Sequence, residues 1–254
     1  MSGTSAMMAL SRRELIRQVR QPSRVVASIV TPLMIWLFIA GGFSSAMGDV
    51  GGGRSSLTAY TIPGMASLTV MFASIFAAIS LIQDRHDGVL RAALVSPAPG
   101  WSIGLSKIGA GSLLAMGQAI IVLLALPFLG VTLTPVGVLG AVLALACVSV
   151  ALIGIGLAMA WIVDSTQGFH GVMNALLMPM WLLSGAVFPV EEAAGWLRVV
   201  ALANPLTWCH AAMRSSLGMS ESFTPEIAWG VSIAFAAAGA MLGIWTISRS
   251  RRSR

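Results

Sequence analysis

The sequence predicts an all-α integral membrane protein with six transmembrane helices, an N-terminal amphipathic interfacial helix, and an extracellular re-entrant helical hairpin between helices five and six. Of its 254 residues, 57% are hydrophobic and only 9% are charged, whereas soluble domains carry about 25% charged residues. Several apolar runs reach the roughly 20 residues needed to cross a bilayer core of about 30 Å. Arginines gather at both ends of the chain, outside these runs. Such clusters fit anionic lipid and cytoplasmic retention rather than nucleic acid.

The first 24 residues are predicted to form a cytoplasmic amphipathic helix, and residues 25–254 the transmembrane domain. Ser11 and Glu14 have the spacing of a capping box, and Pro22 is expected to end the helix. The predicted helix has an apolar side and a basic side, formed by Leu15, Ile16 and Val19 and by Arg13, Arg17 and Arg20. A helix of this kind lies along the face of a membrane.

Six apolar segments follow, and each is predicted to cross the membrane. Their approximate bounds are 25–46, 60–82, 101–127, 136–163, 169–188 and 225–247. A loop rich in Gly and Ser separates the first two segments, and it lacks the pattern of a phosphate-binding loop. Gly154 and Ala158 form a small-xxx-small step that allows close helix packing.

The distribution of basic residues predicts the orientation. An even number of spans places both termini on one side. Of the fifteen Lys and Arg residues, only Arg54, Arg198 and Arg214 then fall on the other side, and the remaining twelve lie with the termini. The positive-inside rule therefore predicts that both termini are cytoplasmic.

The stretch LIQDRHDGVLRAALVSPAPG, residues 81–100, interrupts the apolar sequence on the predicted cytoplasmic side. From Asp87 onward its pattern is helical, and Asp87 and Arg91 have the spacing of a helix ion pair. The apolar face of this helix carries Val89, Leu90, Ala93 and Leu94. Pro97, Pro99 and Gly100 stop the helix. The pattern alone leaves two interpretations open, a helix that docks on a soluble partner and an ordinary connecting loop.

A second unusual stretch, residues 183–214, contains two apolar segments that are too short to span a membrane. The first, residues 191–202, has about 18 Å of helix at 1.5 Å per residue. Asn204-Pro205 breaks the chain, and residues 206–217 can form a second short helix. Two short helices hinged at Asn-Pro predict a re-entrant hairpin on the outer side.

These two stretches resemble the ABC-2-type membrane subunits of ABC exporters, and most closely the drug-resistance permeases related to daunorubicin exporters. The loop resembles the family's coupling helix, with Lys107 early in the following span. The resemblance implies that residues contacting the ATPase are Asp84, Arg85, Asp87, Gly88, Leu90, Arg91, Leu94 and Pro97. The second stretch resembles the family's re-entrant gate at Phe188, Pro189, Glu191, Gly195, Trp196, Leu197, Asn204, Pro205, Leu206 and Thr207.

The resemblance implies a permease subunit in a bacterial plasma membrane that exports hydrophobic or amphipathic substrates, such as drugs, natural products or lipids. A lipid or polysaccharide exporter is the alternative within the family. The chain has no phosphate-binding motif, so we expect no cofactor in it. ATP and Mg²⁺ would act in a separate cytoplasmic ATP-binding subunit, alongside a second permease chain, identical or related.

Two other classes of membrane protein fit the sequence less well. A secondary multidrug carrier usually places Asp, Glu or Arg in mid-membrane, and the predicted spans carry essentially none. An intramembrane hydrolase or transferase would need clustered catalytic residues, whereas Glu191 and Glu192 have only His210 in reach. The three histidines lack metal-ligand spacing, so neither catalytic nor metal-binding residues are expected.

Overall fold

The computed structural model describes residues 3–43, 49–50, 55–90, 99–163, 165–219 and 221–249, with the backbone alone at residues 3, 40–43, 49–50 and 55–57. The described chain is almost entirely helical, as predicted. Its helices are α1 (Gly3–Val19), α2 (Pro22–Phe43), α3 (Leu57–His86), α5 (Gly100–Leu123), α6 (Pro135–Ile162), α7 (Thr166–Leu182), α8 (Gly195–Ala203), α9 (Pro205–Ser216) and α10 (Pro225–Arg249). Two 3₁₀ turns, η1 (Leu126–Leu129) and η2 (Val190–Glu192), and an antiparallel pair of two-residue strands, β1 (Asp49–Val50) and β2 (Ser55–Ser56), complete it.

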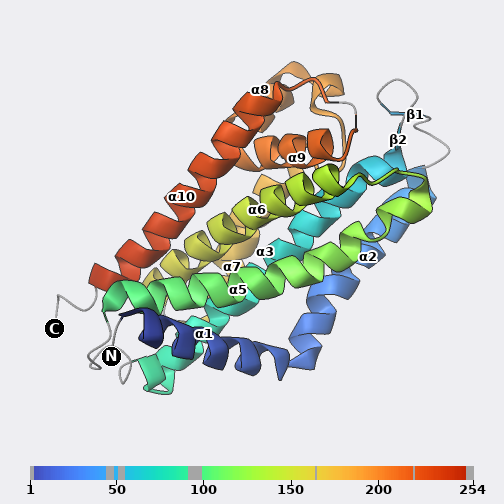
Figure 1. The fold of residues 1–254 in the computed structure, drawn as a ribbon. Coiled ribbons are helices and arrows are strands. Elements are labelled where there is room, and N and C mark those ends of the chain that lie inside the picture. The colour runs from blue at the N-terminus through green and yellow to red at the C-terminus, as the bar shows by residue number, and fades with distance from the viewer. Residues whose placement is uncertain are drawn as a thin grey trace.

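The long helices form one bundle whose two ends differ (Figure 1). The start of α1 and the end of α10 lie at one end, where α1 crosses beneath the bundle; we call this the termini end (Figure 1). The strand pair and the short helices α8 and α9 lie at the opposite end, which we call the hairpin end.

Five helices of the described chain are long and apolar enough to cross a membrane: α2, α3, α5 with its extension through η1, α6 and α10. Helix α7 matches the predicted fifth segment but has only 17 residues. It ends at Leu182, earlier than predicted, because the chain then turns through Gly185 with a φ of +69°. A left-handed residue of this kind cannot continue an α-helix.

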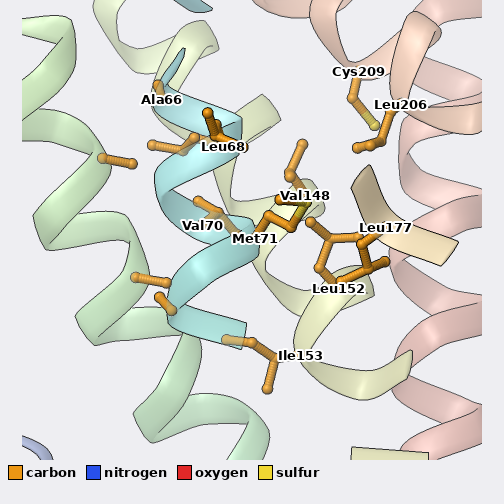
Figure 2. Packing of buried hydrophobic residues seen from close by; sticks show 14 of the residues in the cluster. Ala66, Leu68, Val70, Met71, Val148, Leu152, Ile153, Leu177, Leu206 and Cys209 are labelled. Carbon is orange, nitrogen blue, oxygen red and sulfur yellow. The ribbon is translucent and has the colours of Figure 1, made fainter. Parts of the chain in front are cut away.

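Helix α3 is the central helix and packs against α2, α5, α6, α7 and α9. Of the residues in its most apolar stretch, 89% are buried inside the bundle. Figure 2 shows Met71 of α3 pointing toward Val148 and Leu152 of α6, with Leu177 of α7 beside them. Small hydroxyl side chains such as Ser67 and Ser74 share this core, because each donates a hydrogen bond to a backbone carbonyl of its own helix.

Helices α6 and α10 meet through glycines. A Cβ atom placed on Gly154 of α6 would lie 2.1 Å from the carbonyl oxygen of Gly239 on α10. Gly239 in turn lies against the backbone of Ala151. The small step predicted at Gly154 is therefore a point of backbone-to-backbone contact.

The outside of the bundle is strongly apolar. Its exposed large hydrophobic side chains include Val30, Leu37 and Phe38 on α2, Leu113 and Ile121 on α5, Leu139 and Leu143 on α6, and Ile233, Met241 and Leu242 on α10. A surface this apolar does not suit water, and it fits the hydrocarbon of a bilayer.

Helix α1 differs from its prediction in where it begins. The helix starts at Gly3, so Ser11 lies inside it and the capping-box interpretation was wrong. Ser11 Oγ instead lies 3.4 Å from the carbonyl oxygen of Ser106 on α5. Pro22 does not end α1 but begins α2, where its missing N–H is tolerated. The elbow between the two helices therefore falls at Arg20–Gln21.

Candidate functional site

A cluster of charged side chains joins α1, α3 and α5 at the termini end; we call Arg13, Glu14, Arg17, Asp84 and Lys107 the termini-end charge cluster. The Nζ atom of Lys107 lies 2.7 Å from Oδ2 of Asp84 and 3.3 Å from Oε2 of Glu14. Arg17 also binds Asp84, and Arg13 lies 3.7 Å from the same carboxylate. The side chains of Glu14, Asp84 and Lys107 are buried, so these charges compensate one another in a region of low dielectric.

Hydrogen bonds complete the environment of Glu14. Ser80 Oγ donates to Glu14 Oε1 at 2.7 Å, and Gln18 Nε2 donates to the same oxygen at 3.2 Å. Burial alone would raise the pKa of Glu14, but Lys107, the two hydrogen bonds and Arg17 together lower it below the ordinary 4.5. Glu14 therefore holds α1 on the bundle as a carboxylate.

The predicted coupling residues do not share one environment. Asp84 belongs to the charge cluster and faces α1 and α5. Arg85 donates to the carbonyl oxygens of Ala160 and Trp161 at the end of α6, and its guanidinium lies 4.7 Å from the Trp161 ring centroid. Asp87 is exposed at the end of α3.

Gly88 ends α3 with a φ of +76°, the left-handed conformation that commonly terminates helices. Leu90 is only 3% exposed and belongs to the hydrophobic core. With Val89 it lines a hollow of about 310 Å³, partly open to the surroundings, that also borders the charge cluster. Arg91, Leu94 and Pro97 lie outside the described residues, so their predicted contacts stay predictions.

The Asn204-Pro205 hinge predicted at the hairpin end is present, and its residues explain the turn. Asn204 Oδ1 accepts a hydrogen bond from Leu206 N at 3.1 Å and caps α9. Its Nδ2 donates to Met180 O at the end of α7. Pro205 occupies the first turn of α9. Thr207 Oγ1 donates to Ala201 O at 2.6 Å and satisfies a terminal carbonyl of α8.

The first short helix of the hairpin differs from its prediction. Instead of a continuous helix over 191–202, the 3₁₀ turn η2 at 190–192 precedes α8 at 195–203. The break occurs at Ala193 and Ala194, whose ψ values near 150° are extended. Helix α8 buries only Ala201, and Trp196 is 69% exposed.

A buried polar group anchors the hairpin to α3. Arg214 is fully buried: it binds Glu221, donates from Nη1 to Gly185 O at 3.1 Å, and lies 4.2 Å from the Tyr60 ring centroid. Tyr60 Oη lies 3.4 Å from the carbonyl oxygens of Gly185 and Phe188. Burial raises the pKa of Glu221 above the ordinary 4.5, more than Arg214 lowers it.

His210 lies near this group and is also fully buried. It contacts Ser67 of α3, and its Nδ1 lies 3.2 Å from Ser184 Oγ. Glu191 and Glu192 are exposed instead, so they do not meet His210 as the enzyme hypothesis required. Among the described residues no group of His, Cys, Asp and Glu could hold a metal ion.

Sequence reasoning missed the partners of these buried charges. In the sequence Lys107 belongs to a motif of the coupling loop and Glu14 to a capping pattern, and neither pattern predicts that the two residues meet. The signal in the sequence is that Lys107 and Arg214 are single charges within otherwise apolar or small-residue helix, where an unpaired charge is costly. That signal says that a partner exists but not which one.

The fold defines a multi-pass helical membrane protein with buried ionic contacts at both ends. Residues 5–217 match the family described as ABC-2 type transporter. The chain therefore belongs to the ABC-2 type transporter family.

Several curated proteins are similar to this chain. It is 27% identical over 207 residues to the putative transport permease ycf38 of Cyanophora paradoxa, covering 80% of this chain and 70% of that protein. It is 29% identical over 153 residues to the probable multidrug ABC transporter permease YbhR of Escherichia coli K12, covering 58% of this chain and 40% of YbhR. It is 23% identical over 231 residues to the daunorubicin resistance ABC transporter permease protein DrrB1 of Streptomyces coeruleorubidus, covering 88% and 77%.

Proposed function

We propose that this chain is the transmembrane permease subunit of an ATP-driven ABC exporter, and that it moves hydrophobic or amphipathic substrates from the cytoplasm or inner leaflet outward. The observation that carries this proposal is the family match across residues 5–217. Two relatives named for multidrug transport and daunorubicin resistance support a drug-like cargo. Export of a lipid or polysaccharide is the alternative.

In this proposal α7 crosses the membrane together with the five longer helices, which makes six spans. The termini end faces the bacterial cytoplasm. The 17 residues of α7 extend about 25 Å, close to the thickness of a bilayer core. The arginines that flank both termini support this orientation. Met8, Ile16 and Val19 leave an exposed apolar side on α1, which suits a helix lying in the membrane interface.

A cytoplasmic ATP-binding subunit would bind ATP and Mg²⁺ and hydrolyse the nucleotide. The turn that ends α3 supports a contact with it, because this turn places the exposed Asp87 and the partly buried Gly88 at the termini end. Asp84 would act from behind this turn by linking it to α1 and α5. Motion of the ATPase would then reach three helices at once.

A second permease chain would pack against α7. This helix buries only Phe169, Met173, Leu177 and Trp181, and most of its other residues, including Asn174, are exposed. An amide facing lipid is unfavourable, whereas two amides from facing helices can hydrogen-bond each other. The proposed occupant of this face is therefore another permease chain.

The hairpin of α8 and α9 would be a re-entrant gate at the outer end of the path. Its apolar outer residues, Trp196, Val199 and Val200, suit burial in lipid, while Asn204, Thr207 and Trp208 satisfy the broken backbone internally. Backbone broken at membrane depth requires such internal partners.

The test is ATPase and transport activity of the permease co-expressed with an ABC ATP-binding subunit, purified together in lipid nanodiscs and assayed with daunorubicin in vesicles. The decisive variant is Asp87→Arg, because Asp87 is exposed and Leu90, being buried, is not a clean surface probe. Glu226→Arg is the matched control, an exposed acid in the first turn of α10 at the opposite end.

We expect Asp87→Arg to lose binding or stimulation of the ATPase while Glu226→Arg retains both. If no ATP-binding subunit associates, or if transport continues without ATP and stops with a proton ionophore, the exporter proposal is wrong and a secondary carrier replaces it.

A further inference from the structure

A pocket lies at the elbow where α1 meets α2. Its free space is about 300 Å³, a volume that includes part of the open surroundings, and it is lined by Gln18, Gln21, Arg24, Val25, Ala73, Phe76, Leu114 and Gln118. Its polar half is formed by Gln18, Gln21 and Arg24 at the elbow together with Gln118 of α5, and its apolar half by Val25, Ala73, Phe76 and Leu114. None of its residues belongs to the predicted coupling loop or to the hairpin.

Arg24 is the cation of this pocket. Its guanidinium lies 5.9 Å from the centroid of the Phe76 ring. Within the described chain Arg24 has neither an ion pair nor a hydrogen-bonded side-chain partner, unlike Arg17 and Lys107 nearby. A half-buried guanidinium without an anion favours a ligand that supplies one.

Gln118 provides an independent indication of a ligand. The residue is only 5% exposed. Its Oε1 lies 2.9 Å from Ser28 Oγ, and its Nε2 has no hydrogen-bonding partner in the described part of the chain. Gln118 lines the pocket, so a ligand held there can complete the hydrogen bonding of its amide.

The position of the pocket indicates where the ligand comes from. Phe76 precedes Asp84 on α3 by two helical turns, about 12 Å along the helix axis. The pocket therefore lies farther into the bundle than the charge cluster. Arg24 and Val25 lie in the first turn of α2, and Gln21 directly precedes it.

We propose that this pocket binds an anionic phospholipid, with the phosphate on Arg24 and the pocket amides and an acyl chain against Phe76 and Leu114. Free phosphate would satisfy the polar half alone and leave the apolar half empty. This proposal requires only that α2 lies in a membrane. It does not depend on ATP-driven export, so it can fail or hold separately from the proposed function.

The test is native mass spectrometry of the full chain, delipidated in detergent and given equal amounts of phosphatidylglycerol and phosphatidylcholine. Wild type should retain phosphatidylglycerol about fivefold over phosphatidylcholine, the factor expected for one arginine near an anionic headgroup. Arg24→Gln should remove this preference, and Arg24→Lys should keep most of it, because lysine and arginine attract an anionic headgroup through the same charge. Arg20→Gln, an exposed neighbour outside the pocket, is the matched control and should behave as wild type.

Two further measurements keep the proposal open to refutation. Leu114→Trp fills the apolar half and should reduce retention of both lipids, and thermal unfolding without lipid should be equal for Arg24→Gln and wild type. The proposal is overturned if Arg20→Gln and Arg24→Gln lower the preference equally. It is also overturned if millimolar inorganic phosphate displaces phosphatidylglycerol, because the ligand is then a free anion.

Discussion

Lys107 and Asp84 form a buried ion pair with 2.7 Å between Nζ and Oδ2, and it joins the start of α5 to the end of α3. Glu14 of α1 shares the same ammonium group at 3.3 Å. One lysine thus connects three helices at the end of the bundle where the proposed ATPase would bind.

Replacing this lysine is expected to be costly. Lys107→Met leaves two buried carboxylates without their shared cation, and breaking such a pair costs about 3–5 kcal/mol. Thermal unfolding in detergent measures the loss. Arg12→Met removes an exposed cation of α1 and should change the midpoint little. Equal midpoints for the two variants would contradict the role given to the cluster.

The docking of α1 should depend on pH through Glu14. Because the folded state lowers the pKa of this carboxyl below 4.5, its stabilisation is complete above that value and is lost as pH falls through the folded pKa. The groups facing it are Arg17 and Gln18 on α1, Ser80 and Asp84 on α3, and Lys107 on α5. We expect Glu14→Gln to lose stability at neutral pH and to show a shallower decline toward acid. A parallel decline in both proteins would assign the effect elsewhere.

The glycine contact between α6 and α10 should not tolerate a methyl group. Gly154→Ala places a Cβ against the Gly239 carbonyl, and such overpacking costs about 1–3 kcal/mol. Gly117→Ala on α5 is the control, because a Cβ there meets no atom within 4 Å. That change should be neutral or stabilise by about 0.5–1 kcal/mol, since alanine favours the helix. Unfolding midpoints of the two variants should therefore move in different directions.

Asn204 should matter to the hairpin because it caps α9 and binds α7. Asn204→Ala removes both hydrogen bonds, and we expect a loss of about 1–2 kcal/mol. Limited proteolysis at the hairpin, together with unfolding, would report it. Asn174→Ala, which removes an exposed amide, should leave monomer stability nearly unchanged. If the two variants are alike, the cap contributes nothing measurable.

If two permease chains pair through α7, the α7 helices of the two chains should lie next to each other. On a background of Cys147→Ala and Cys209→Ala, Asn174→Cys should form a disulfide-linked dimer in membranes under mild oxidation. Leu242→Cys on α10, also exposed, should not. Cross-linking at 242 alone would move the interface to α10.

Most of the helices could be predicted from the length of the apolar runs and from the prolines that begin or end them. The predicted segments 136–163 and 225–247 fall within two residues of α6 and α10, because Pro begins each helix and an unbroken apolar run continues it. The Asn204-Pro205 hinge was equally readable, since proline cannot continue a preceding helix. Local errors arose where weak signals compete, as at Ser11 and at Ala193–Ala194.

The candidate site was less predictable. Leu90 belongs to an apolar face in the sequence pattern, and that pattern does not distinguish a face that binds a partner from one that packs inside. Its burial against the chain's own α1 and α5 decides this. The same limit applies to Arg24. In the sequence it is one of several N-terminal arginines, and only the positions of α3 and α5 show that it lines a pocket.

The sequence by itself determined the class of the protein, the position of its long helices, the side on which basic residues accumulate, and the hinge of the hairpin. These features depend on residues within about 20 positions of one another. Only the tertiary structure decided that Glu14, Asp84 and Lys107 share one site and that Arg214 contacts Glu221 and Tyr60. It also decided that Arg24 has no carboxylate partner within the described residues. The partner of a buried charge depends on how each helix is rotated and where helices cross, and these are set by packing across the whole bundle.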